Sequence, residues 1–142
     1  RWRTRVATTQ ALRSDPKHEP DPQPRRFTVV RSVHSLERSV ELCECMIDIA
    51  AALYNVSGRD LRHPGRSSHP VARVRQIAMY VAHVVLGLSM NEVGRGFGRD
   101  RTTVLYACHL VEDMREDQEF DRIIAMTERV ASAALRNRGG AY

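Results

Sequence analysis

The chain has 142 residues, of which 42% are hydrophobic and only 6% aromatic, and it carries a net charge of +5. This length suits one small domain with tails, and the balance favours a helical core built on aliphatic side chains. The longest apolar stretch, residues 77–88, is interrupted by His83 and is too short to span a bilayer, so we expect no membrane segment.

Nearly all of the positive charge is arginine, because Lys17 is the one lysine in the sequence. A planar guanidinium suits phosphate and guanine recognition. Residues 59–111 hold eight basic and three acidic side chains, whereas residues 112–129 hold three basic and seven acidic ones. This pattern predicts one face for a polyanion, although charge alone does not separate that face from a solvated arginine-rich surface.

The cysteines are odd in number and lack zinc-site spacing: Cys43, Cys45 and Cys108. We expect reduced structural thiols and no metal site.

Three regions are predicted along the chain. Residues 1–31 form a basic, proline-rich tail that we expect to be disordered, since four of the six prolines fall within residues 16–24. Trp2 and its neighbouring arginines suggest an alternative, a basic arm that touches DNA. Residues 32–136 form a helical domain, and residues 137–142 form a flexible tail.

A first helix is predicted over residues 35–55, with Ser35 as its N-cap. Its apolar stripe has spacings of four and three: Leu36, Val40, Cys43, Ile47, Ala50 and Tyr54. Ser57 caps a short turn through Leu61, and residues 62–69 read as a loop.

Pro70 is expected at the first position of a second helix. Its buried stripe is Val74, Ile77, Ala78, Val81 and Val85. Residues 112–121, farther along, are expected to be a solvated acidic face.

A capping box from Ser89 to Glu92 opens a short third helix over residues 90–97, and Gly98 ends it. Asp100 or Thr102 caps a fourth helix. A fifth helix over residues 119–135 is expected to carry an apolar face: Phe120, Ile123, Ile124, Val130 and Ala134.

A short capped helix, a glycine turn and a longer helix with a polar start are typical of a helix-turn-helix. The second helix of that motif must project its first turn into the major groove. Residues 99–103 read Arg-Asp-Arg-Thr-Thr, which are polar side chains suited to base edges. We therefore predict an all-α fold, a small bundle containing a helix-turn-helix of the Trp-repressor-like type.

Three ordered motifs resemble the C-terminal DNA-binding domain of DnaA, the bacterial replication initiator. They are the run from Val71 to Tyr80, the pattern Ser89-x-x-Glu-Val-Gly-x-x-Phe-Gly, and Arg99-Asp-x-Thr-Thr-Val-Leu-x-Ala-Cys. The chain is also similar to short stand-alone paralogues of that domain, which lack the ATPase; no GxxxxGK[ST] phosphate loop is present.

The resemblance implies roles for particular residues. Base reading falls to Arg99, Asp100, Arg101 and Thr102. Phosphate or minor-groove contact falls to Arg66, Arg73, Arg75, Gln76 and Thr103. The sequence departs from the family where Arg101 replaces a histidine, where one residue is missing before Arg99, and where the basic loop is poorer in charge.

The expected function is sequence-specific binding of double-stranded DNA that regulates replication initiation at DnaA-box-like sites. We expect no catalytic residue, no cofactor and no membrane partner, and we expect a cytoplasmic, nucleoid-associated protein. Replication-initiation or other regulatory proteins are a second class of partner. A transcriptional regulator on the same scaffold, or an adaptor that binds proteins with little DNA affinity, remains an alternative.

Overall fold

The structure is a computed structural model that describes residues 26–136. The predictions for residues 1–25 and 137–142 lie outside the described residues. Every regular element within residues 26–136 is helical, which confirms the predicted all-α class. The elements are α2 (Arg26–Tyr54), α3 (Gly58–Arg62), α4 (His69–Val84), α5 (Met90–Phe97), α6 (Arg101–Met114), α7 (Gln118–Ala131) and a π-helical turn, η1 (Ser132–Arg136).

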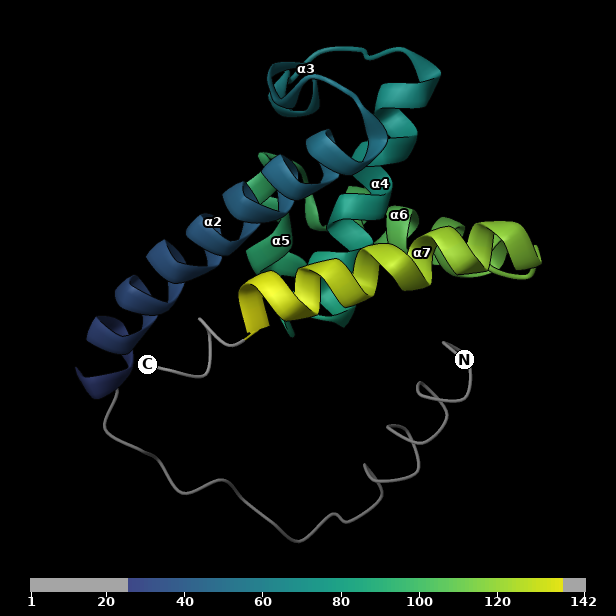
Figure 1. Cartoon of the computed structure of the whole chain (residues 1–142). Coiled ribbons are helices and arrows are strands. Elements are labelled where there is room, and N and C mark those ends of the chain that lie inside the picture. The colour runs from purple at the N-terminus through teal and green to yellow at the C-terminus, as the bar shows by residue number, and fades with distance from the viewer. Residues whose placement is uncertain (1–25, 137–142) are drawn as a thin grey trace, which may run out of the picture.

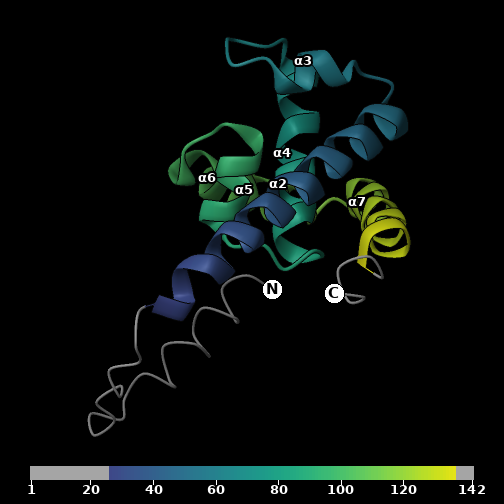
Figure 2. The same cartoon turned by 90° about the vertical axis from the view of Figure 1, so that its left-hand side faces the viewer.

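Helix α4 is the centre of the bundle and packs against α2, α5, α6 and α7. Helix α2 runs diagonally across the other helices, and its N-terminal turns extend beyond them (Figures 1 and 2). Helix α3 and the loop that follows it lie at the end of the molecule where α4 begins (Figure 1). None of the helices in the described part of the chain is long and apolar enough to cross a membrane.

Helix α2 begins at Arg26, earlier than the predicted start at Ser35. Residues 26–31, which we assigned to the tail, are therefore helical, and Ser35 lies inside the helix rather than capping it. The physical reason is that no glycine or proline lies between Pro24 and Gly58, so nothing stops the helix before Ser35. The remaining division of the chain into tails and domain stays a prediction.

The buried face of α2 is largely as predicted, since Cys43, Ile47 and Ala50 are buried. Val40 is an exception because 36% of it is exposed, and the neighbouring Ser39 is buried in its place. A polar residue takes this inward position because its hydroxyl has hydrogen-bond partners there, as described below.

Helix α4 begins one residue before Pro70, which occupies its second position. Val74, Ile77, Ala78 and Val81 are buried as predicted. The buried surface is wider than one stripe because a central helix meets neighbours on several sides. It also takes in Arg75, Met79, Tyr80 and Ala82.

The predicted apolar face of the last helix is wrong in part. Ile124 is buried, but Ile123 is 43% exposed and Ala134 is exposed. Ile124 shares the buried face with three residues that were not predicted to be buried: Thr127, Ala131 and Leu135. A polar residue serves at this interface because the Thr127 hydroxyl lies 2.7 Å from the Tyr54 hydroxyl and also donates to the Ile123 carbonyl.

Residues 112–121, predicted to be a solvated acidic face, are solvated only in part. Arg115 donates to Asp121 and Glu128 at 2.6 Å each, and Glu112 accepts from the Tyr80 hydroxyl. Burial opposes the charge of Arg115, but hydrogen bonds to Asp121, Tyr80 and Glu128 outweigh it and raise the pKa of the guanidinium. These carboxylates therefore fasten α7 to α4 and α6.

Candidate nucleic-acid interface

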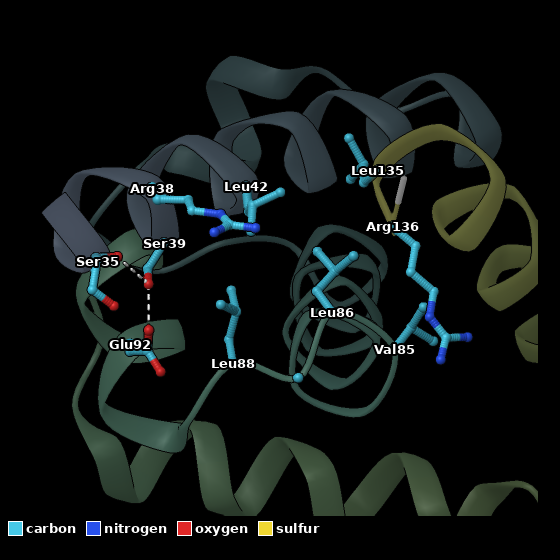
Figure 3. A pocket seen from close by; sticks show the side chains of 11 residues that line it. Ser35, Arg38, Ser39, Leu42, Val85, Leu86, Leu88, Glu92, Leu135 and Arg136 are labelled. Atoms are coloured by element: carbon cyan, nitrogen blue, oxygen red, sulfur yellow. Dashed lines mark hydrogen bonds between the residues drawn. The ribbon is translucent and has the colours of Figure 1, made fainter. Parts of the chain in front are cut away.

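The N-terminus of α5 carries the predicted capping box. The backbone N–H of Glu92 donates to Ser89 Oγ at 3.1 Å, and the N–H of Ser89 donates to Glu92 Oε1 at 3.0 Å. The other carboxylate oxygen of Glu92 accepts from the Ser39 hydroxyl of α2, as the dashed line in Figure 3 marks. Burial opposes ionisation here, but the hydrogen bonds from Ser39 and Ser89 lower the pKa of Glu92. One carboxylate thus caps α5 and anchors it to α2.

The turn between α5 and α6 depends on two glycines. Gly98 has φ +65°, the left-handed conformation predicted for the end of this helix. The N–H of Arg99 then donates back to the Gly94 carbonyl at 2.7 Å. A Cβ on Gly94 would lie 2.6 Å from the Arg99 carbonyl oxygen, so a side chain there would push the turn open.

Four polar side chains project from the start of α6. Asp100 is the N-cap residue by position, yet its carboxylate makes no capping hydrogen bond. Arg101, Thr102 and Thr103 are exposed. The buried Val104 follows them and fixes the helix to the core. The carboxylate, the guanidinium and the two hydroxyls are therefore directed away from the bundle, as base or phosphate contacts require.

Arg99, the remaining predicted base reader, is half-buried. Its Nη1 donates to the Pro64 carbonyl at 3.1 Å, and its Nη2 donates to the His63 carbonyl at 2.6 Å. Its Nε is buried without a hydrogen-bond partner. A base-reading role for Arg99 stays a prediction; in the unbound protein its terminal nitrogens contact the loop after α3.

Arg75 was predicted to contact phosphate, but the structure buries it to 7% exposure. Nε donates to the Leu61 carbonyl at 2.9 Å, and Nη2 donates to the Asp60 carbonyl at 3.0 Å and to Ser67 Oγ at 2.6 Å. Burial and the charge of Arg99 lower its pKa. Sequence periodicity could not reveal this role, because these acceptors lie in α3 and in the loop after it, whose placement beside α4 periodicity does not give.

The other predicted backbone contacts lie nearer the surface. Arg66 is exposed in the loop between α3 and α4. Arg73 and Gln76 are half-buried one turn apart on α4, and Arg73 Nη1 donates to Gln76 Oε1 at 3.3 Å. Thr103 is exposed on α6. The contact of Arg99 with His63 and Pro64 brings this loop beside the start of α6, so the predicted minor-groove and major-groove elements are neighbours.

Tyr106 was missed by the sequence reasoning. It lies on α6 one turn after Thr102 and is 64% exposed, which is unusual for an aromatic side chain. Residues four apart share a helix face, so its ring continues the projecting surface. The signal was available, because the inward stripe of α6 leaves this position on the outer side.

A pocket of about 540 Å³ lies at the other end of α4 from the loop. Figure 3 draws its lining, which is mixed: aliphatic side chains of α2, the segment after α4 and η1 lie beside polar ones, among them Arg38 and Arg136. The buried Ser39–Glu92 hydrogen bond forms part of its wall. In the described part of the chain, no group of three or more His, Cys, Asp or Glu side chains could hold a metal ion.

Two comparisons with known proteins show what the chain is similar to. A crystal structure of a DNA replication initiation factor superposes with a TM-score of 0.65 and 23% sequence identity, over 75% of this chain and 35% of the other. That likeness concerns the fold alone, and this chain spans about a third of that protein's length. Residues 43–111 match the family model described as the bacterial DnaA protein helix-turn-helix, which covers α5, the turn and most of α6. Residues 43–111 of this chain are therefore similar to the helix-turn-helix of the bacterial DnaA protein.

Proposed function

We propose that this protein binds double-stranded DNA sequence-selectively, at sites that overlap those of the DnaA initiator, and that it thereby regulates replication initiation. The observation that carries the proposal is the exposure of the polar side chains at the start of α6. Asp100, Arg101, Thr102 and Thr103 project from the motif, and none of their side chains has a hydrogen bond or ion pair with residues 35–136, whose side chains the structure describes.

The chemistry of that turn suits base edges in the major groove. A guanidinium donates a bidentate pair to guanine O6 and N7, and a carboxylate accepts from cytosine N4. The threonines offer a hydroxyl for phosphate and a methyl group for thymine. The Asp100 carboxylate is available for such a contact because it makes no capping bond.

The loop after α3 supports a second contact, with the minor groove or the phosphate backbone. Arg66 is exposed in this loop, and the loop adjoins the start of α6 through the Arg99 hydrogen bonds. A protein that places a helix in one groove and a basic loop beside it neutralises several phosphates, so its affinity must depend steeply on salt.

A role in replication regulation requires binding alone. A protein that occupies the initiator's sites competes with the initiator without hydrolysing ATP. The match of residues 43–111 to the bacterial DnaA helix-turn-helix model supports an overlap of sites. The same interface would serve a transcriptional regulator, and competition with the initiator for one duplex tests the replication role.

The test is a filter-binding titration of the full chain against a duplex that carries a DnaA-box-like site and against a shuffled duplex of equal composition, each at two salt concentrations. We expect tighter binding to the box, and a log affinity that falls with log salt by about 0.9 per phosphate contact. Equal affinity for both duplexes would show that the protein does not bind DNA sequence-selectively. Absence of salt-dependent binding to either duplex would favour the adaptor.

A further inference from the structure

Two arginines from separate elements donate hydrogen bonds to the loop between α3 and α4. Arg75 of α4 contacts the last turn of α3, through the carbonyls of Asp60 and Leu61, and the end of the loop, through Ser67 Oγ. Arg99 of the α5–α6 turn contacts the first two residues of the loop, through the carbonyls of His63 and Pro64. In the sequence, the five acceptor residues lie on both sides of the exposed Arg66, and Arg66 is not one of them.

Neither guanidinium has a carboxylate partner. The ion pairs of the described residues involve Arg62 and Arg115, and the acceptors of Arg75 and Arg99 are carbonyl or hydroxyl oxygens. The two groups also repel each other, since the charge of Arg99 opposes that of Arg75. A core built for stability alone would place a carboxylate between them, whereas a surface meant for a polyanion gains from leaving both charges uncompensated.

We propose that Arg75 and Arg99 are positioning residues, which hold residues 63–67 against the α5–α6 turn so that Arg66 meets the DNA in fixed register with Arg101. This inference rests on the proposed DNA-binding function. The two arginines act on the DNA through the loop. Arg75 joins its C-terminal end and the last turn of α3 to α4, and Arg99, which precedes the N-cap residue of α6, holds its first two residues. Minor-groove contact and major-groove reading are thereby coupled.

Lysine substitutions separate this role from the phosphate and base contacts that the sequence suggested. A lysine keeps the charge but has one ammonium group in place of the planar fork, so it cannot span two carbonyls in the manner of Arg75 or Arg99. A phosphate contact tolerates the exchange, because an ammonium group also binds phosphate. Arg73→Lys is the matched control, since Arg73 lies on α4 two residues away and bonds Gln76 rather than the loop.

The first measurement uses no DNA. Trypsin cleaves after Arg66 only when the loop leaves its anchored path, and mass spectrometry identifies the cut. We expect cleavage after Arg66 to be about tenfold faster in Arg75→Lys and Arg99→Lys than in the unmodified protein and in Arg73→Lys, with circular dichroism confirming that each variant is folded. A tenfold change corresponds to about 1.4 kcal/mol of loop anchoring. Equal cleavage rates in all four proteins would overturn the proposal, whatever the protein binds.

The second measurement is a double-mutant cycle on DNA affinity between Arg66→Ala and Arg99→Lys. If Arg99 positions Arg66, the affinity lost on removing Arg66 should be largely absent once Arg99 is lysine. Losses that multiply independently would overturn the coupling. If the unmodified protein does not bind duplex DNA, the proposed function fails, while the cleavage experiment still decides whether these arginines anchor the loop.

Discussion

Arg101 is the residue on which sequence preference should depend most. It is the first residue of α6, it is exposed, and its side chain has no hydrogen bond or ion pair to any of residues 35–136, the part of the chain with described side chains. No internal contact must therefore break when the guanidinium meets a base. A bidentate pair with guanine contributes about 1–3 kcal/mol of discrimination, which is roughly 5- to 150-fold in affinity at one base pair.

We expect Arg101→Ala to lose that discrimination at one base pair of the site and to leave the preferences at the other positions in place. Arg101→Lys keeps the charge without the planar fork. Its discrimination at that base pair should therefore lie between those of the unmodified protein and Arg101→Ala. The assay is fluorescence anisotropy on a panel of single-base variants of the preferred site. Arg122→Ala is the charge control, because Arg122 is exposed on α7 and removing it subtracts the same charge away from the reading turn.

The reasoning is refuted if Arg101→Ala weakens every member of the panel by the same factor. Arg101 would then be a phosphate contact, and the selectivity would have to come from its neighbours on α6 or from the shape of the DNA.

Three further expectations concern the scaffold that holds this turn. Phe97 is 6% exposed, so Phe97→Ala should lower the free energy of unfolding by ~3–5 kcal/mol in urea titrations, and a loss under about 1 kcal/mol would show that the ring contributes little packing. In Gly96→Ala the new methyl group would lie 2.4 Å from Cys43 Sγ and 2.5 Å from Cys43 Cβ, so thermal melts should show an overpacking loss of ~1–3 kcal/mol; a midpoint equal to that of the unmodified protein would contradict this close approach of α5 to α2. Because the pKa of Glu92 is lowered in the folded state, the ionised carboxylate stabilises the fold above its ordinary value of 4.5 and this stabilisation is lost as pH falls through the lowered pKa. The stability advantage of the unmodified protein over Glu92→Gln should therefore shrink below about pH 4.5, and an advantage independent of pH would contradict this role.

Local signals predicted the helix-turn-helix well. The capping box from Ser89 to Glu92 and the left-handed Gly98 are short-range features, so the sequence alone placed the third helix where the structure has it. The start of the first helix was misplaced because the stretch after Pro24 contains no stop signal of its own. The inward face of α7 was misjudged because Thr127 is buried by a partner, Tyr54, that is distant in the sequence.

For the candidate site, too, the sequence predicted the features that depend on local pattern and not those that depend on the path of a loop. The exposure of Arg101, Thr102 and Thr103 follows from helix periodicity, which the sequence contains. The environments of Arg75 and Arg99 depend on the path of the loop after α3, which periodicity does not describe. A family resemblance assigns both residues to DNA, whereas the structure shows that their nitrogens contact the protein's own backbone in the unbound state. Tyr106 lies in the second turn of α6, where the motif's sequence pattern gives no signal for a base or phosphate contact, and the extent of its exposure is apparent only in the structure.

Selection of bound sequences from a random duplex pool tests the central claim most directly. Sequencing of the fraction retained by the full chain should yield one enriched motif that overlaps the DnaA box and carries a G·C pair at the position facing Arg101. The same selection with Arg101→Ala should return that motif without the G·C preference. A retained fraction no different from the starting pool would contradict the claim that this protein reads DNA sequence.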